Sequence, residues 1–266
     1  MRLTIHHQTQ YKYEVAANYA LQQMRLRPHS NAAQSILSWD VVLEGATQQT
    51  QFTDQHGNLV DLLELEPGRS EVTVTVSGEV ETRNVNGVVG PHRLMMPLWF
   101  YQRETTLTKA GTGVSKLIDG LNPKDGEELT TLHELSQRIQ TAITYQTGQT
   151  STKTTAENAL QHGAGVCQDH THVFLAAARS LGLPARYVSG YLMMNDRVDQ
   201  DASHAWAETH VDGLGWVGFD ISNAISPDER YVQIAYGLDY RGAAPTRGFL
   251  VGAKHEDLAV SIQVQQ

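Results

Sequence analysis

The only cysteine of the chain stands where the sequence predicts the first turn of a helix. Cys167 is the single cysteine among 266 residues. Apolar residues recur with helical spacing over 168–181, and Gly182 with Pro184 two positions later marks a helix end. A thiol in a first helical turn faces unpaired backbone N–H groups and the positive end of the helix dipole. Because that setting favours the thiolate and could hold an oxyanion, we interpret Cys167 as a nucleophile.

A nucleophilic cysteine needs a base, and the base needs an orienting group. Residues 201–211 alternate as a strand, with His204 near its start. Asp212-Gly213 is typical of a hairpin turn, and the returning strand ends at the carboxylate of Asp220. A hairpin would carry Asp220 back towards the start of the His204 strand. The sequence therefore predicts a cysteine, a histidine and an aspartate acting together, in that chain order.

Three segments of the chain resemble the core of the transglutaminase-like superfamily, in the bacterial branch whose members are often described as cysteine proteases. The segments are residues 165–172, 203–206 and 216–220. Residues 1–28 resemble the β domain that precedes this core in bacterial members, so the resemblance covers nearly the whole chain. It implies a catalytic triad of Cys167, His204 and Asp220 in a papain-like or transglutaminase-like core. One position departs from the family pattern, because Ile221-Ser222 stands where Pro-Thr is common.

The pattern of strands and helices predicts an α+β fold with two domains, since 266 residues exceed the usual single domain of about 100–150. Residues 1–108 are predicted to form an antiparallel β-sandwich, and residues 109–266 a catalytic core of helices packed on an antiparallel sheet. The expected strands of the first domain are 2–13, 38–44, 59–65 and 71–80. The core is expected to hold a helix from about 126 to about 145, a short helix over 156–161, the cysteine helix, and strands at 185–193, 201–211, 215–220, 229–235 and 258–264. We also expect that the C-terminal strands could pair back onto the first domain.

Composition excludes several classes of protein. The chain has 20 Lys and Arg against 29 Asp and Glu, a formal net charge of -9, and no basic run, which argues against nucleic acid and membrane partners. No signal-like segment and no apolar run of about 20 residues is evident, so a cytoplasmic location is expected. A lone cysteine leaves no internal disulfide, which agrees with a reducing compartment.

Other histidines near the cysteine compete for the catalytic or metal-binding role. His162, His170 and His172 are close in sequence, but positions 167 and 172 of a helix face different directions. No second cysteine completes a structural zinc set, and no EF-hand loop is present, so neither a metal nor another cofactor is expected. Asp169 is expected to cap the cysteine helix rather than to act on substrate.

The expected reaction is acyl transfer from an amide through a thioester. Hydrolysis of a protein, peptide or small-amide substrate is favoured, because no dedicated amine channel is evident. A transglutaminase is the alternative, with Glu208 drawing an amine and Trp206 shielding it, although both residues are equally expected as a solvated charge and a packed ring. A non-catalytic binding module of the same fold is the third possibility. The backbone N–H of Cys167 is expected to hold the oxyanion, and Gln161 is a weak candidate by analogy for the second donor.

Overall fold

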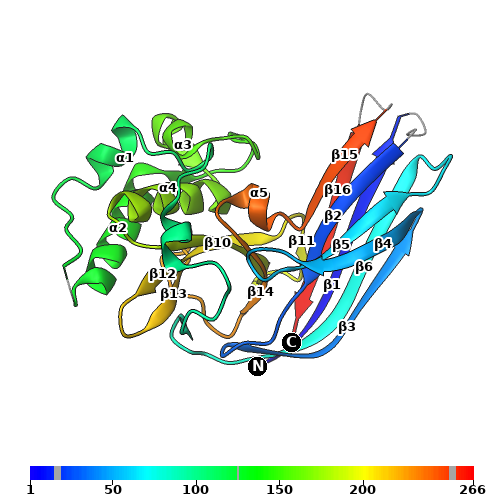
Figure 1. Cartoon of the computed structure of the whole chain (residues 1–266), viewed down its shortest axis with the longest axis horizontal. Coiled ribbons are helices and arrows are strands. Elements are labelled where there is room, and N and C mark those ends of the chain that lie inside the picture. Colours follow the sequence, from blue (N-terminus) through cyan, green and yellow to red (C-terminus); the bar gives the residue numbers. More distant parts are fainter. Residues whose placement is uncertain (15–18, 125, 252–255) are drawn as a thin grey trace.

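Three antiparallel sheets and a layer of helices build the structure, a computed structural model that describes residues 1–14, 19–124, 126–251 and 256–266. Figure 1 shows the helices gathered at one end of the molecule and two of the sheets at the other end, with the third sheet between them. This layering is the α+β arrangement that the sequence predicted. The third sheet and the helices that cover it carry the predicted residues Cys167, His204 and Asp220.

Two sheets pack face to face to form the predicted β-sandwich. The first has the strand order β11-β16-β1-β6-β3, and the second has the order β15-β2-β5-β4. The strands of the first are β1 (Arg2–Tyr13), β3 (Gln34–Glu44), β6 (Glu71–Thr82), β11 (Asp199–Gln200) and β16 (Glu256–Gln265). Those of the second are β2 (Tyr19–Arg27), β4 (Ala46–Thr53), β5 (Leu59–Leu65) and β15 (Thr246–Val251). Alternate valines of β6, such as Val74, share one buried cluster with Leu63 of β5, so the core lies between the two sheets.

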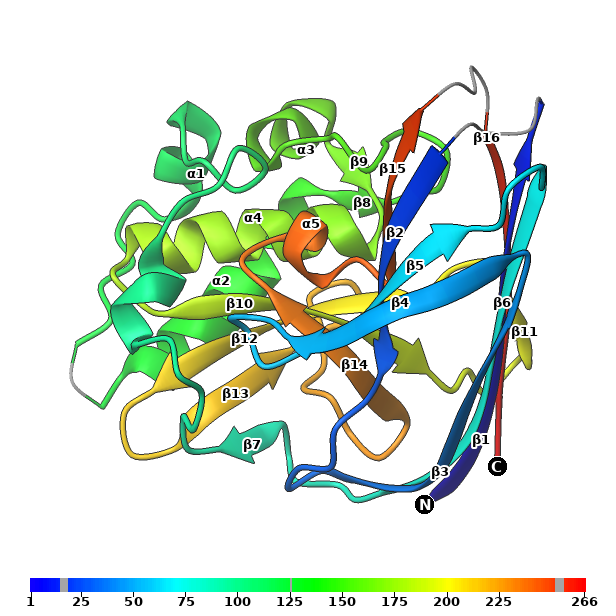
Figure 2. The same cartoon turned by 45° about the vertical axis from the view of Figure 1, so that its right-hand side comes forward.

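The C-terminal strands close the sandwich rather than the catalytic sheet. β16 pairs with β1 in antiparallel register from Thr4↔Gln265 to Tyr13↔Glu256, and β15 pairs with β2. Figure 2 shows both strands running beside the N-terminal strands. The assignment of these strands to the core is therefore corrected, whereas their expected return to the first domain is confirmed. Nine residues of β1, 4–12, pair with β6 on one side and with β16, from the far end of the chain, on the other.

The third sheet has the order β14-β10-β12-β13-β7, and the helices cover one of its faces (Figure 1). Its strands are β7 (Val88–Gly90), β10 (Ala185–Leu192), β12 (His204–Val211), β13 (Gly215–Phe219) and β14 (Tyr231–Gly237). The helices are η1 (Leu98–Gln102), α1 (Thr112–Leu117), α2 (Glu128–Ala142), α3 (Ala156–His162), α4 (Cys167–Ser180) and α5 (Tyr240–Ala243). A short parallel pair, β8 (Thr144–Tyr145) and β9 (Ala164–Gly165), leads into α4.

Amphipathic spacing explains how the helices sit on this sheet. The apolar stripe of α2 buries Leu132 and Ile139 completely, and α4 buries Val173 and Phe174 in the same cluster as Ala207 of β12. The central helix α4 therefore lies between the sheet and the other helices. In the part of the chain that the structure describes, no helix is both long and apolar enough to cross a membrane.

The third sheet also packs against the sandwich. Tyr191 of β10 and Val232 of β14 belong to the sandwich cluster, and the Tyr191 hydroxyl lies 2.6 Å from Nδ1 of His7. The two parts thus share a core, and strands from the end of the chain return to the first part. The domain boundary between residues 108 and 109 stays a prediction.

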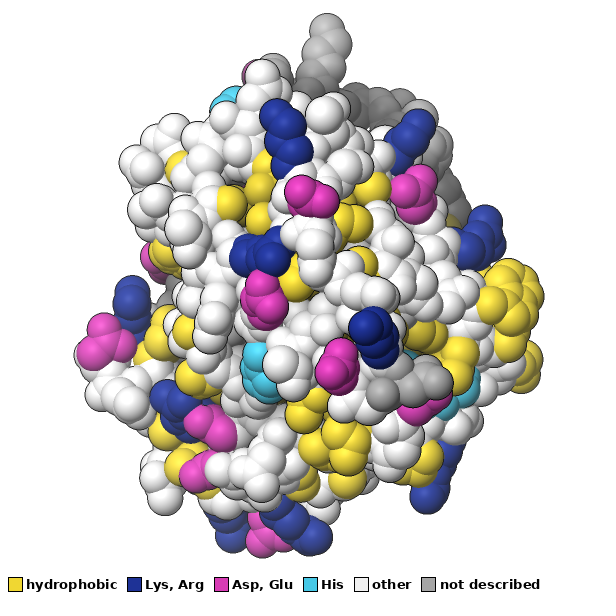
Figure 3. Space-filling model, turned by 90° about the vertical axis from the view of Figure 1, so that its left-hand side faces the viewer, with side chains coloured by type: hydrophobic (Ala, Val, Ile, Leu, Met, Phe, Trp, Pro, Cys, Tyr) yellow, Lys and Arg dark blue, Asp and Glu magenta, His cyan; other side chains and the backbone are white. Residues whose placement is uncertain are grey.

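Charged side chains are mixed on the face shown in Figure 3. Dark-blue Lys and Arg and magenta Asp and Glu lie interspersed there, and neither sign gathers into a single large patch. A nucleic acid or an anionic membrane would need a continuous basic surface. The expectation that neither is a partner stays a prediction.

Candidate active site

Cys167 is the first residue of α4, as the sequence predicted. Gly163 ends α3 in the left-handed conformation with φ 66°, and Val166 precedes the helix in an extended conformation. A Cβ atom on Gly165 would lie 2.7 Å from the Asp169 side chain, so only glycine fits at that position. Gly163 therefore turns the chain out of α3, and Gly165 leaves room for Asp169 beside the segment that leads to the thiol.

Asp169 caps the cysteine helix, which confirms the prediction. Its Oδ2 atom accepts hydrogen bonds from the Val166 backbone N–H at 2.8 Å and from the Thr150 hydroxyl at 2.6 Å. The side chain is almost fully buried. Because it fixes the residue just before Cys167, its role is to hold the first turn in place.

The β12–β13 hairpin brings His204 and Asp220 together. Strand pairing runs from Ala207↔Phe219 to Val211↔Gly215, and Asp220 follows β13 directly. The Nε2 atom of His204 lies 2.6 Å from Oδ2 of Asp220. Side-chain exposure is 11% for His204 and 0% for Asp220, so the carboxylate lies behind the imidazole and away from solvent.

The Asp220 carboxylate is held by five donors. Oδ2 accepts from His204, from the Tyr231 hydroxyl at 2.7 Å and from the Asn223 side chain at 2.7 Å. Oδ1 accepts from the Ser222 hydroxyl at 2.8 Å and from the Asn223 backbone at 3.2 Å. The loop with the unusual Ile-Ser pair thus still donates hydrogen bonds to the aspartate. Burial raises the pKa of Asp220, but these hydrogen bonds and the positive charge of His204 outweigh it and lower the pKa to about 2.

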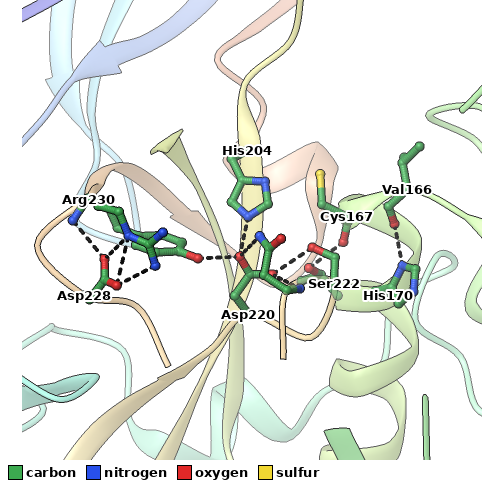
Figure 4. Close-up of polar contacts among 11 residues, drawn as sticks. Val166, Cys167, His170, His204, Asp220, Ser222, Asp228 and Arg230 are labelled. Atoms are coloured by element: carbon green, nitrogen blue, oxygen red, sulfur yellow. Dashed lines mark hydrogen bonds and ion pairs between the residues drawn. The ribbon is translucent and has the colours of Figure 1, made fainter. Parts of the chain in front are cut away.

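His204 stays protonated well above neutral pH. Burial lowers its pKa, but the hydrogen bond to Asp220 and the interaction with the Cys167 side chain raise it to about 10. Figure 4 shows the Cys167 sulfur on the side of the imidazole away from Asp220. With Nε2 occupied by the carboxylate, Nδ1 is the nitrogen left to face the sulfur. The structure therefore brings the three predicted residues together, and their catalytic roles stay a prediction.

The rival histidines have other positions. His170 is buried, with Nδ1 2.9 Å from the Val166 carbonyl oxygen and Nε2 3.1 Å from that of Ile143. His172 is also buried and accepts from the Tyr240 backbone N–H at 3.2 Å, and burial lowers its pKa to about 4. His162 is exposed at the end of α3. Among the described residues, no cluster of three His, Cys, Asp or Glu side chains could hold a metal ion.

Trp206 and Tyr231 form the wall behind the imidazole. The Trp206 ring stacks on His204 with centroids 6.3 Å apart, and Tyr231 meets Trp206 edge-on at 5.4 Å. Trp206 was expected as a packed ring, but Tyr231 was missed by sequence reasoning. It comes from β14, two strands away from β12, and no local pattern links it to Asp220.

The expectation that Glu208 could be a solvated charge available to an amine is wrong. Its side chain is 1% exposed, and Oε2 accepts from Nε and Nη2 of Arg186 at 2.8 and 2.6 Å. Oε1 accepts from the Gln233 side chain at 2.9 Å. The alternation of β12 placed Glu208 on the same face as His204, but the sandwich side of the molecule covers that part of the face.

Two family models match the chain. Residues 3–81 match the bacterial transglutaminase-like N-terminal region, and residues 116–221 match the transglutaminase-like superfamily. The chain thus carries a transglutaminase-like core preceded by a bacterial transglutaminase-like N-terminal region. The second match contains Cys167, His204 and Asp220, so the residues assembled by the structure lie inside the superfamily core.

Relatives of similar length exist in bacteria. An uncharacterised protein of Mycobacterium leprae is 29% identical over 279 residues, which cover 99% of this chain and 98% of that protein. An uncharacterised protein of Mycobacterium tuberculosis is 26% identical over 292 residues, which cover 99% of this chain and 92% of that protein. A crystal structure from Cytophaga hutchinsonii, described as a candidate cysteine protease, has a TM-score of 0.75 at 18% identity and covers 100% of this chain and 98% of its own. That likeness shows a shared fold.

Replacing Tyr231 with phenylalanine is expected to weaken the site without dismantling it. The variant loses one of three donors to Oδ2 of Asp220, and a hydrogen bond to a charged group contributes about 1.5 kcal/mol or somewhat more. We expect turnover to fall by roughly tenfold and the pH profile of turnover to shift. Tyr191→Phe is the matched control, because it removes the hydroxyl of another buried tyrosine, one that bonds His7 and no triad residue. Equal effects of the two substitutions on turnover would show that Tyr231 acts only through stability.

Proposed function

We propose that the protein is a cysteine-dependent enzyme that transfers the acyl group of an amide through a thioester, with hydrolysis as its main outcome. The observation that carries this proposal is the arrangement of His204, which is bonded to Asp220 through Nε2 and faces the sulfur of Cys167 with its other side. In this proposal Cys167 is the nucleophile, His204 moves the proton and Asp220 orients the imidazole.

The proposed reaction has two half-reactions. The Cys167 thiolate attacks the amide carbonyl carbon, and the carbonyl oxygen becomes an oxyanion. As the carbon–nitrogen bond breaks, the leaving amine takes a proton from His204, and the acyl group remains on sulfur as a thioester. Water then gives a proton to His204 and attacks the thioester, which releases a carboxylic acid and restores the thiolate. A histidine protonated before the first step supplies the proton that the amine needs.

Backbone amides at the start of α4 are the proposed oxyanion donors. The N–H of Cys167 has no intrahelical acceptor, because Cys167 is the first residue of α4 and no helical turn precedes it. Gln161 is exposed on α3, and among the described residues its side chain has no polar partner at the site. We therefore propose the Cys167 amide as one donor and leave Gln161 without a role in the mechanism.

The burial of Glu208 and its ion pair with Arg186 favour hydrolysis over transamidation. A transglutaminase must bind an amine beside the thioester and exclude water from it. The carboxylate that could have attracted the amine is buried and paired with Arg186. Tyr145 is an exposed aromatic residue close enough to Cys167 to interact with it electrostatically, and its raised pKa leaves it without charge at neutral pH. A non-catalytic module is disfavoured because all three reacting groups are present and assembled.

We expect a glutaminyl peptide to be hydrolysed even in the presence of a millimolar primary amine. Both outcomes share the acylation step and release ammonia from the side-chain amide, so the product must be identified by mass rather than by ammonia release. Mass spectrometry would distinguish the glutamate product from the amine adduct, with Cys167→Ala as the blank. A dominant adduct would contradict hydrolysis and establish the transglutaminase alternative. The protein, peptide or small-amide nature of the natural substrate and the cytoplasmic location stay predictions.

A further inference from the structure

A cavity of about 520 Å³ lies on the sandwich side of the third sheet, away from the triad. Its floor comes from strands β10, β13 and β14, and its walls come from the β2–β3 loop, the β4–β5 turn and residues 89–94. Pockets for small organic ligands commonly have volumes of about 300–1,000 Å³, so the cavity is large enough for one.

An arginine held between two aromatic rings forms the floor of this cavity. The Arg186 guanidinium lies 4.2 Å from the centre of the Trp216 ring and 3.7 Å from that of Tyr236. Glu208 binds one edge of the same guanidinium from below. The ion pair and the two rings lock this side chain, which is only 3% exposed, so it holds the two rings in fixed positions at the floor of the cavity.

The charged side chains that line the cavity are all basic. They are Arg186 on the floor and Arg93 at the rim; the imidazole of His29 also lies at the rim, and among the described residues no carboxylate lines the cavity. This bias runs against the chain as a whole, in which acidic residues outnumber Lys and Arg by 29 to 20. Within the described part of the chain, the exposed side chains of His29 and Arg93 have no hydrogen-bond or ion-pair partner. Two donors are therefore free to meet an anion above an aromatic floor.

The cavity is separate from the proposed active site. His204 and Glu208 lie on one face of β12, and four residues of a strand span roughly 13 Å. None of the triad residues lines the cavity, and the buried Trp206 lies on the strand between its floor and the imidazole. A ligand here would bind without contact to the reacting atoms.

We propose that this cavity binds a small organic anion with an aromatic or apolar body and one negatively charged group. The body packs on Tyr236 and on the apolar wall formed by Pro91 and Leu94, and the charged group meets Arg93 and His29 at the rim. Any ligand of this kind has an anionic group attached to a flat apolar frame. This site goes beyond the proposed acyl transfer, which uses none of these residues.

The dye 8-anilinonaphthalene-1-sulfonate is a suitable probe, because it joins a sulfonate to an aromatic frame and fluoresces in apolar surroundings. We expect saturable binding at one site per full-length chain, unchanged after Cys167 is blocked with iodoacetamide. Arg93→Gln should weaken binding roughly fivefold or more, since it removes a charged donor. Ala32→Trp should abolish binding, because exposed Ala32 lines the cavity and a large ring there fills it.

Matched controls separate this site from unspecific dye binding. Arg83→Gln removes an exposed arginine that pairs with Glu81 outside the cavity, and it should leave the affinity unchanged. Arg186 is not a useful target, since its loss would leave Glu208 buried without its partner. The neutral analogue N-phenyl-1-naphthylamine should bind more weakly than the sulfonate. Full binding by Ala32→Trp, equal binding of the neutral dye, or loss of binding on alkylation of Cys167 would each overturn the proposal.

Discussion

Replacing Cys167 with alanine should abolish turnover, and adding His204→Ala to that variant should cost little more. The two side chains act in one step, because the thiolate forms the bond to carbon and the imidazole supplies the proton to the leaving group. Catalytic groups that work as a unit are strongly non-additive, so each single variant should lose roughly 10⁴-fold or more and the double variant about the same. Turnover of a peptide amide by the three variants would measure this.

Alkylation of Cys167 supplies a second readout that does not need a substrate. His204 has a pKa of about 10, so the imidazole is protonated at pH 6 and keeps its positive charge beside the sulfur. Iodoacetamide should therefore label the wild type quickly at pH 6, whereas the His204→Ala variant should label slowly there and faster as pH rises. His162→Ala, which changes an exposed histidine at the end of α3, is the matched control and should behave as the wild type. Slow, ordinary thiol labelling of the wild type would instead support the non-catalytic module.

The reacting groups could be predicted because each belongs to a short local pattern. The glycines before Cys167 and the Gly182 stop define one helix, and its first residue follows from them. The register of a tight hairpin is set by its turn, so the distance between His204 and Asp220 followed from the Asp212-Gly213 pair. In both cases the chain between the residues is short, and few arrangements of the backbone are open to it.

The parts that could not be predicted depend on contacts between distant segments. Tyr231 meets Asp220 only because β14 pairs with β10, and nothing in either strand specifies that partner. Glu208 has the alternation of a surface strand, but the sandwich covers it and Arg186 neutralises it. The two C-terminal strands show the same limit, since their hydrogen-bond partners lie more than 200 residues away. Alternation predicts which side chains share a face, and it does not predict what covers that face.

Asp220→Asn should lower turnover by a factor on the order of 10²–10⁴ while leaving the protein folded. The carboxylate has a pKa of about 2, so it is ionised at every pH at which the enzyme would be assayed, and its charge stabilises protonated His204. An asparagine can still offer its amide oxygen to the three donors that meet Oδ2. Its NH2 group would then face the Ser222 hydroxyl and the Asn223 backbone N–H, of which only the hydroxyl can accept. The imidazole thus loses its counter-charge and part of its fixed orientation.

Ser222→Ala is the control that distinguishes charge from packing. It removes one neutral donor to Oδ1 but keeps the carboxylate and the bond to His204, so turnover should fall by about tenfold at most. For Asp220→Asn, the loss should be greatest where turnover depends on protonated His204, because the neutral amide no longer holds the pKa of that imidazole high. The alkaline limb of the pH profile should therefore move to lower pH in Asp220→Asn and stay in place in Ser222→Ala. A fully active Asp220→Asn enzyme, or equal losses in the two variants, would mean that another residue orients His204.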